Sequence, residues 1–270
     1  MPELPEVEVV RSTLDQALRG HTLKDLECFY LPIIEGDFQS FKKAVLHQKI
    51  VRVGRYAKYL IFYLENGAML SHLRMEGKYY FQKESEELPK YVHLIFHLNN
   101  GYRLAYGDMR KFGRLTFRLE NELFTTPPLM CVGVEANSDQ IDVDKLFTCI
   151  SKKSLPIKSL LLDQHLLSGL GNIYADEVLF DAKVYPLKKG KEVTIEEFKR
   201  IVASSKRILD KAIACKGTTI RSYTSSLGVI GGYQDYLNVH TKTTCPICNT
   251  MLIKIKIGGR MTYFCKTCQG

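Results

Sequence analysis

The apolar positions of residues 3–19 recur with the spacing of an α-helix. Leu4, Val7, Val10, Leu14 and Leu18 fall on one stripe, because residues three or four positions apart share a helix face. We therefore predict an amphipathic N-terminal helix that packs on the segment after it.

From about residue 22 to residue 119 the pattern changes to that of β-strands. Runs such as VRVGRYAKYLIFYL and YVHLIFHLNNGYRLAYG are rich in aromatic and β-branched residues, which favour strands. Glu65-Asn66-Gly67 and Asn99-Asn100-Gly101 have the composition of hairpin turns. We predict a β-sandwich carrying the first helix, with a second helix at about 38–47 and a connecting segment at 120–141.

Beyond residue 141 the helical pattern returns. Gly169 and Gly171 separate two of the predicted helices, since glycine breaks helical runs. Residues 216–240 are rich in Gly, Ser and Thr, and we predict a mobile loop there. The predicted helices are 142–152, 157–165, 172–182 and 195–215. The fold class is therefore α+β and multidomain.

Composition narrows the class of protein. With 45% hydrophobic and 25% charged residues in 270, the chain is expected to be soluble and globular. No apolar run is long enough to span a bilayer and no secretion signal stands at the start, so we expect a cytoplasmic protein. The net charge of +9 favours a polyanionic partner such as nucleic acid.

Four of the eight cysteines form two Cys-x2-Cys pairs near the C-terminus. Such pairs, joined by a hairpin, are typical of a tetrahedral four-thiolate zinc site, whose full protein coordination makes the metal structural. A redox interpretation explains one pair and leaves the other unused. The predicted ligands are Cys245, Cys248, Cys265 and Cys268. The scattered Cys28, Cys131, Cys149 and Cys215 are predicted to be buried thiols.

The segment Met1-Pro2-Glu3-Leu4-Pro5-Glu6 suggests covalent chemistry. Removal of Met1 would expose the secondary amine of Pro2, and an α-amino group titrates near ~7.7–8.0. That amine can attack an aldehyde-like carbon to form an iminium ion, with Glu3 and Glu6 as proton carriers. The alternative is architectural, since proline and acids are ordinary in the first turn of a helix.

Three further segments are candidates for nucleic-acid contacts. Ser168 to Glu177 places a glycine-rich turn before a helix, where backbone N–H groups and Asn172 can hold a phosphate. Asp108 to Gly113 and His72 to Gly77 place Phe112 and Met75 beside cations. These two side chains are ordinary core residues or wedges that enter a base stack.

Taken together, these motifs resemble bacterial formamidopyrimidine-DNA glycosylases over essentially the whole chain. The motifs are PELPEVE, SHLRMEGKY, DMRKFG, LLDQHLLSGLGNIYADEVLF and GGRMTYFCKTCQ. The resemblance implies an N-terminal β-sandwich with flanking helices, a helix–two-turn–helix module and a zinc-finger hairpin. It implies the domains 1–133, 134–152 (linker and first helix), 153–240 with a lesion-capping loop at 216–236, and 241–270.

The resemblance also implies an activity. Members of this family are bifunctional DNA glycosylases and AP lyases that remove oxidised purines such as 8-oxoguanine and formamidopyrimidines in base-excision repair. The implied cofactor is one structural zinc ion, without a redox or nucleotide cofactor. We accordingly expect damaged double-stranded DNA as the partner, a monomer, no membrane association, and a bacterial cytoplasmic protein that joins the nucleoid when acting.

Roles are implied residue by residue. Pro2 is the Schiff-base nucleophile, Glu3 moves protons near the sugar and Glu6 supports the site, while Lys58 and Arg260 contact phosphates and assist elimination. Met75, Arg110 and Phe112 fill the gap left by the flipped base. The other implied DNA contacts are His72, Tyr91, Lys153, Lys158 and Asn172. The lesion pocket comprises Glu76, Thr218, Thr219, Ile220, Arg221, Ser222 and Tyr223.

The chain also departs from the family pattern. Tyr91 stands where the family has a histidine, Ala57 precedes Lys58 in place of glycine, and His240 stands in place of tyrosine. No catalytic group is lost. Three alternatives to the glycosylase reading remain open: a relative with another preferred lesion, a non-catalytic protein that binds damaged DNA, and a zinc-ribbon protein of transcription or translation.

Overall fold

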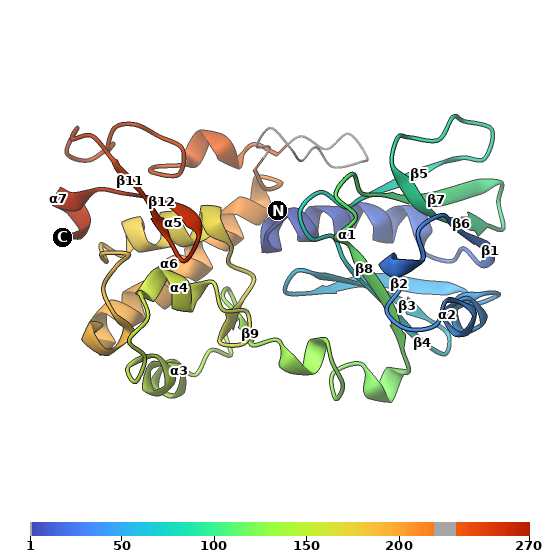
Figure 1. Cartoon of the computed structure of the whole chain (residues 1–270), viewed down its shortest axis with the longest axis horizontal. Coiled ribbons are helices and arrows are strands. Elements are labelled where there is room, and N and C mark those ends of the chain that lie inside the picture. The colour runs from blue at the N-terminus through green and yellow to red at the C-terminus, as the bar shows by residue number, and fades with distance from the viewer. Residues whose placement is uncertain (1, 219–230) are drawn as a thin grey trace. The chain divides into compact units, whose positions relative to one another are not determined.

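The computed structural model describes residues 2–218 and 231–270 (Figure 1). The chain forms two compact units. The first unit comprises residues up to Cys131 together with Thr218 and Gly231, and the second comprises 132–217 and 232–270. The helical segment and the cysteine-rich segment, predicted as separate domains, thus share one unit.

The first unit is built on two four-stranded antiparallel sheets, as expected for a sandwich. One sheet has the order β1-β6-β7-β5, formed by Leu23–Cys28, Val92–Leu98, Tyr102–Gly107 and Lys78–Lys83. The other has the order β2-β3-β4-β8, formed by Ile50–Tyr56, Tyr59–Leu64, Gly67–His72 and Arg114–Arg118. Inward side chains of both sheets contribute to one hydrophobic core.

Helix α1 (Leu4–Leu18) packs against β2 and β3. Its predicted apolar stripe is buried, and Val7, Val10, Leu14 and Leu18 belong to the core of the sandwich. Helix α2 (Phe38–Val45) has Asp37 as its N-cap. The Asp37 carboxylate accepts a hydrogen bond from the Ser40 N–H at 2.6 Å. The N-terminal helix is therefore fixed to the sheets along its whole length.

The second unit is mainly helical. The two longest helices, α5 and α6, pack on each other, and α3 and α4 pack on α6 and α5 respectively. The helices are α3 (Val143–Ile150), α4 (Ile157–Leu161), α5 (Asn172–Asp181) and α6 (Ile195–Ala214). A short parallel pair, β9 (Val134–Glu135) with β10 (Leu167–Ser168), precedes α5.

The second unit ends in a hairpin and a short helix. Strands β11 (Ile253–Ile257) and β12 (Arg260–Phe264) pair antiparallel, and α7 (Lys266–Gln269) follows. Both β12 and α7 contact α5. The cysteine-rich segment is consequently anchored to the helix that follows the glycine-rich turn.

Two sequence-based expectations need correction. Helix α4 ends at Leu161, earlier than predicted, because a turn over 163–166 follows it. Cys131 and Cys149 are exposed, whereas Cys28 and Cys215 are partly buried; the periodicity of the short elements does not distinguish a buried from an exposed cysteine. Within residues 2–218 and 231–270, no helix has the length and apolarity needed to cross a membrane.

Candidate functional site

Pro2 lies just outside helix α1. The helix begins at Leu4, Glu3 is its extended N-cap, and the proline of its first turn is Pro5. The architectural explanation of a proline in the first turn therefore applies to Pro5 and leaves Pro2 unexplained. Pro2 is itself buried.

Glu6 holds the segment that carries Pro2. One of its carboxylate oxygens accepts a hydrogen bond from the Glu3 N–H at 2.9 Å. The other oxygen accepts from the N–H of Thr218 at 2.8 Å and from its hydroxyl at 3.1 Å. Both oxygens thus accept from buried donors, so Glu6 ties the backbone next to Pro2 to Thr218.

Thr218 is the only member of the predicted lesion pocket from its loop that the structure describes. Its side chain is buried and directed at Glu6, so it anchors the start of the loop. Thr219, Ile220, Arg221, Ser222 and Tyr223 lie outside the described residues.

Lys58 and His72 are brought together by the pairing of β3 with β4, which sets Tyr59 opposite His72. Burial, followed by the charges of Arg74 and Lys58, lowers the pKa of His72 to about 3. The His72 Nδ1 atom lies 2.9 Å from the Arg74 N–H and accepts from it. The ring is therefore neutral at physiological pH and keeps its proton on Nε2, where it can donate to a phosphate.

Asp108 builds the loop that displays the predicted wedge. Its carboxylate accepts hydrogen bonds from the N–H groups of Arg110, Phe112 and Gly113 at 3.0, 2.9 and 2.8 Å. With the backbone curled around this buried carboxylate, Phe112 remains 46% exposed. The Arg110 guanidinium carbon lies 4.8 Å from the centre of the Phe112 ring, a cation–π contact. A large apolar side chain held outward beside a cation suits insertion into a base stack.

Tyr106 joins this loop to the one that carries Met75. A Cβ atom on Gly113 would lie 1.8 Å from the Tyr106 hydroxyl, and a Cβ atom on Gly77 would lie 2.1 Å from it. Both loops can therefore converge on this tyrosine only because both positions are glycine. Met75 is half-buried and lies two residues before Gly77.

Glu76 and Tyr91 line one hollow of about 380 Å³, together with Asp108 and Met109. Lys78 and Lys90 supply positive charge to its wall. Tyr91 is 55% exposed, and its carbonyl accepts from the Asp108 N–H at 3.0 Å. The structure thus places the predicted pocket residue Glu76 beside the predicted DNA contact Tyr91.

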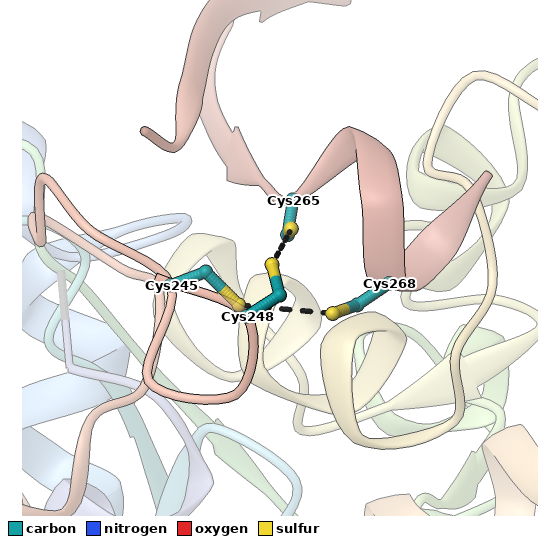
Figure 2. Close-up of side chains that lie close together, drawn as sticks. All are labelled: Cys245, Cys248, Cys265 and Cys268. Atoms are coloured by element: carbon teal, nitrogen blue, oxygen red, sulfur yellow. Dashed lines mark hydrogen bonds between the residues drawn. The ribbon is translucent and has the colours of Figure 1, made fainter. Parts of the chain in front are cut away.

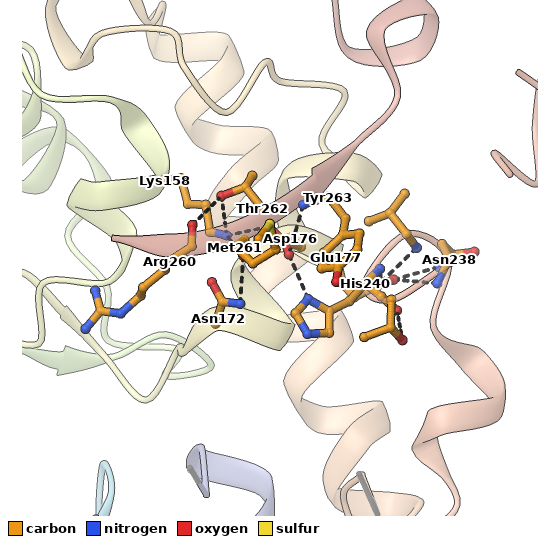
Figure 3. Close-up of polar contacts among 12 residues, drawn as sticks. Lys158, Asn172, Asp176, Glu177, Asn238, His240, Arg260, Met261, Thr262 and Tyr263 are labelled. Carbon is orange, nitrogen blue, oxygen red and sulfur yellow. Dashed lines mark hydrogen bonds and ion pairs between the residues drawn. The ribbon is translucent and has the colours of Figure 1, made fainter. Parts of the chain in front are cut away.

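In the second unit, the ammonium group of Lys158 lies inside the protein. Its side chain is completely buried and forms an ion pair with Asp176 at 2.7 Å. It also donates to the Met261 carbonyl at 3.1 Å and to the Thr262 hydroxyl at 2.8 Å (Figure 3). A direct phosphate contact through this ammonium group is incompatible with such burial, so Lys158 supports strand β12.

Asn172 also contacts β12. Its amide nitrogen donates to the Met261 carbonyl at 2.9 Å, and its side chain is half-buried at the first residue of α5. The glycine-rich turn ends at Gly171, the extended N-cap of that helix. Lys153 is also half-buried.

Arg260 stands at the tip of the β11–β12 hairpin. Ile257 pairs with Arg260 across a two-residue turn, and the turn residues Gly258 and Gly259 have φ values of 54° and 77°. A two-residue turn with both φ values positive favours glycine at both positions. The Arg260 side chain is exposed and therefore available to an external anion.

The four cysteines meet as predicted (Figure 2). Their sulfur atoms all lie within 4.8 Å of one another, with Cys245 and Cys268 3.8 Å apart and Cys248 and Cys265 3.4 Å apart. A tetrahedral zinc ion with Zn–S bonds of about 2.3 Å requires sulfur separations of about 3.8 Å. The donor set and its spacing therefore fit one structural zinc ion.

Several supporting residues were not identified from the sequence. Asp108, Asp176 and Glu177 read as ordinary polar residues of a loop and a helix, yet all three are buried. His240 was noted only as a departure from a tyrosine, but its Nδ1 atom lies 2.7 Å from the Asp176 carboxylate. The sequence signal that could have found the two helical acids is their place in an otherwise apolar helix.

Comparison with known proteins gives three consecutive family matches. Residues 1–115 match the formamidopyrimidine-DNA glycosylase N-terminal domain, and 132–224 match the H2TH domain of the same enzymes. Residues 244–270 match a zinc finger found in FPG and IleRS.

Full-length relatives agree with these matches. A formamidopyrimidine-DNA glycosylase of Exiguobacterium sibiricum is 42% identical, covering 100% of this chain and 99% of its own. One from Streptococcus pneumoniae is 39% identical with the same coverage. Among solved structures, a complex of Lactococcus lactis Fpg with DNA containing an abasic site superposes with a TM-score of 0.93 at 36% identity, covering 99% of both chains. A mutant of that protein bound to Fapy-dG DNA gives 0.94 at 35% identity, also covering 99% of both.

Proposed function

The chain belongs to the formamidopyrimidine-DNA glycosylase family, and on that premise we propose that it excises oxidised purines from duplex DNA and then cuts the strand at the abasic site. The observation that carries this proposal is the N-terminus. Pro2 is buried but lies outside the helix that follows it, and Glu6 fixes the adjoining backbone. Neither the fold nor the zinc site explains a proline held in this way, whereas a Schiff-base nucleophile does.

The reaction begins with the flipped nucleotide. The nitrogen of Pro2 attacks C1′, and the bond from C1′ to the base breaks as the base takes up a proton. Glu3, 2% exposed, is the proposed carrier of protons at the sugar because it is the residue directly after Pro2, and Glu6 holds its backbone N–H. The Pro2 nitrogen loses its proton, and the C1′–O4′ bond breaks as O4′ takes up a proton. The product is the ring-opened sugar with an iminium ion at C1′ that is bonded to Pro2.

Strand cleavage follows from the charge of this iminium ion. The charge acidifies C2′; loss of a C2′ proton expels the 3′ phosphate, and a second elimination expels the 5′ phosphate. Lys58 and Arg260 are the proposed cations for these phosphates. Hydrolysis of the remaining adduct frees the enzyme.

Base flipping must occur first, because the reacting carbon is inaccessible inside a duplex. Flipping costs a few kcal/mol, and side chains that fill the vacated stack offset part of that cost. Phe112 and Arg110 are exposed on a preformed loop, and Met75 lies on the loop that meets it at Tyr106. These three residues are the proposed wedge and probe of the opposite base.

The remaining residues are assigned supporting or binding roles. His72, as a neutral donor, and Tyr91 are proposed DNA contacts, with Lys153 and Asn172 near the backbone. Glu76 is proposed to border the lesion pocket. The zinc ion keeps the finger folded, and the finger carries Arg260. The relatives compared above are bacterial, and we propose a bacterial cytoplasmic monomer that acts at the nucleoid.

Borohydride trapping tests the proposal. Duplex DNA with one 8-oxoguanine opposite cytosine is reduced in the presence of the protein, and the N-terminal peptide is analysed by mass spectrometry. We expect a covalent adduct on Pro2 in molecules that lack Met1, and none with Pro2→Gly. Equal cleavage by the parent and Pro2→Gly would show that another group is the nucleophile. An adduct on an abasic duplex alone would shift the assignment to another lesion.

A further inference from the structure

Helix α5 carries two adjacent acids that are both buried. Asp176 is 1% exposed and Glu177 0% exposed, although consecutive helical positions point in different directions. Buried carboxylates are costly unless they are paired and hydrogen-bonded. The two acids are directed at the segments that precede the two cysteine pairs of the zinc site (Figure 3).

Glu177 fastens the chain that enters the finger. Its two oxygens accept from the N–H groups of Asn238, Val239 and His240 at 2.8, 2.9 and 2.8 Å. These contacts involve backbone groups before Cys245, so Glu177 fixes the approach to the zinc site.

Asp176 contacts β12 itself. One oxygen pairs with the Lys158 ammonium group at 2.7 Å. The other lies 2.7 Å from His240 Nδ1 and 3.3 Å from the N–H of Tyr263. The carboxylate thereby links α4, α5, the segment before the finger and the strand that begins with Arg260.

The first residues of β12 are held at consecutive positions. Lys158 and Asn172 both donate to the Met261 carbonyl, and Lys158 also donates to the Thr262 hydroxyl. Asp176 completes the set at Tyr263 and orients Lys158 through the ion pair. On the other side of the turn formed by Gly258 and Gly259, Ile257 of β11 pairs with Arg260. The position of Arg260 is thus set by the hairpin, and these side-chain contacts anchor the hairpin through β12.

We propose that Asp176 is a positioning residue for Arg260. This inference rests on the proposed function, in which Arg260 assists the second elimination. Asp176 does not touch DNA: it fixes Lys158 and β12, and these fix the backbone from which the Arg260 guanidinium reaches a phosphate. Loss of the carboxylate charge should therefore impair the step that uses Arg260 more than the step that uses Pro2.

The test compares Asp176→Asn with Asp181→Asn. Asp181 is on the same helix, but its carboxylate pairs with Arg207 and accepts from Ser204, contacts that do not involve β12. Each variant is assayed on 8-oxoguanine duplex for base release and for the ratio of doubly to singly eliminated product. We expect Asp176→Asn to lower that ratio about tenfold, with base release nearly unchanged, since a small misplacement of a catalytic group costs up to about a hundredfold.

A double mutant distinguishes positioning from general damage. If Asp176 acts through Arg260, Asp176→Asn should have no further effect on the product ratio in an Arg260→Ala background. If the effects of Asp176→Asn and Arg260→Ala on the product ratio multiply in the double mutant, the proposal is overturned. An equal loss of base release and of elimination in Asp176→Asn would also overturn it. So would an effect of Asp181→Asn as large as that of Asp176→Asn. Zinc content is measured for every variant.

A second variant covers the case in which Asp176→Asn does not fold. His240→Phe keeps a ring beside Tyr263, whose centre is 5.1 Å from that of His240, and removes only the contact with Asp176. It should reduce the product ratio selectively but less strongly, and an unchanged ratio would count against the proposal.

Failure of the proposed function can be recognised separately. A parent protein that forms no borohydride adduct would contradict the glycosylase mechanism. Binding to a duplex with a tetrahydrofuran abasic analogue would still test Asp176. The logarithm of the binding constant falls linearly with the logarithm of the salt concentration, and loss of one phosphate contact lowers the size of that slope by about one. Asp176→Asn should therefore reproduce the slope of Arg260→Ala. A parental slope in Asp176→Asn would overturn the positioning role.

Discussion

Replacement of Glu6 by glutamine tests whether this residue holds the nucleophile in place. The carboxylate accepts from the Glu3 N–H on one oxygen and from the Thr218 N–H and hydroxyl on the other. An amide has one acceptor oxygen and one NH2 group that can only donate. Whichever way the glutamine amide is turned in Glu6→Gln, its NH2 group therefore faces a buried backbone N–H, and that N–H loses its acceptor.

The size of the effect follows from these contacts. A hydrogen bond to a charged group contributes about 1.5–3 kcal/mol, so the loss of one should lower the free energy of unfolding of the first unit by about 2 kcal/mol. With a denaturant slope of about 2 kcal/mol per molar, the urea midpoint should fall by about 1 M. Trapping of the DNA adduct should fall about tenfold or more, because the reacting amine is no longer held in place.

The matched control is Glu8→Gln on the same helix. Glu8 is 21% exposed in its pair with Arg55 and forms a second ion pair with Arg11, so its replacement should cost less than about 1 kcal/mol. Tyrosine fluorescence follows unfolding, since the chain has no tryptophan. A parental midpoint and parental trapping in Glu6→Gln would refute the reasoning, as would equal losses in the two variants.

Three further predictions concern the wedge, pH and zinc. Gly113→Ala should lower the free energy of unfolding of the first unit by about 1–3 kcal/mol, because the added methyl group overlaps the Tyr106 hydroxyl. Tyr106→Phe in the Gly113→Ala background should restore part of the urea midpoint. Full parental stability of Gly113→Ala would contradict the overlap. For His97, burial lowers the pKa, but the hydrogen bonds and charges of Glu84 and Glu27 outweigh it and raise the pKa above 6.5. Protonated His97 should therefore stabilise the fold by less than about 1 kcal/mol. This stabilisation should be present below pH 6.5 and disappear as the pH rises through the raised pKa. If the difference in free energy of unfolding between the parent and His97→Gln does not vary from pH 5.5 to 8.5, His97 makes no such contribution. Removal of zinc by a chelator should unfold the finger and weaken DNA binding. Added zinc should restore the fold of the finger and the affinity for DNA. An unchanged affinity for DNA in the metal-free protein would exclude a binding role for the finger.

The parts of the fold with strong periodicity could be predicted from the sequence. The apolar stripe of α1 and the alternating strands of the sandwich are local signals, because each arises from one face being buried. The zinc ligands were also predictable, since their spacing determines which side chains can meet. In each case the information lies within a short stretch of chain.

The supporting network could not be predicted in the same way. Asp176 bonds with Lys158, His240 and Tyr263, and these partners are distant in sequence. The burial of Lys158 could not be predicted for the same reason, because a lysine in a basic protein is expected at the surface. Burial of a charge becomes visible only once the elements are packed.

The shared contact of two loops with Tyr106 has a consequence for how this protein can change over time. Positions 77, 106 and 113 are separated along the chain but occupy one point in space, since neither glycine leaves room for a methyl group beside the tyrosine hydroxyl. A loop exchanged at either place must therefore bring a glycine at this position, or else the Tyr106 hydroxyl must be lost. The freedom to redesign the wedge is thus limited by a tyrosine that belongs to neither loop.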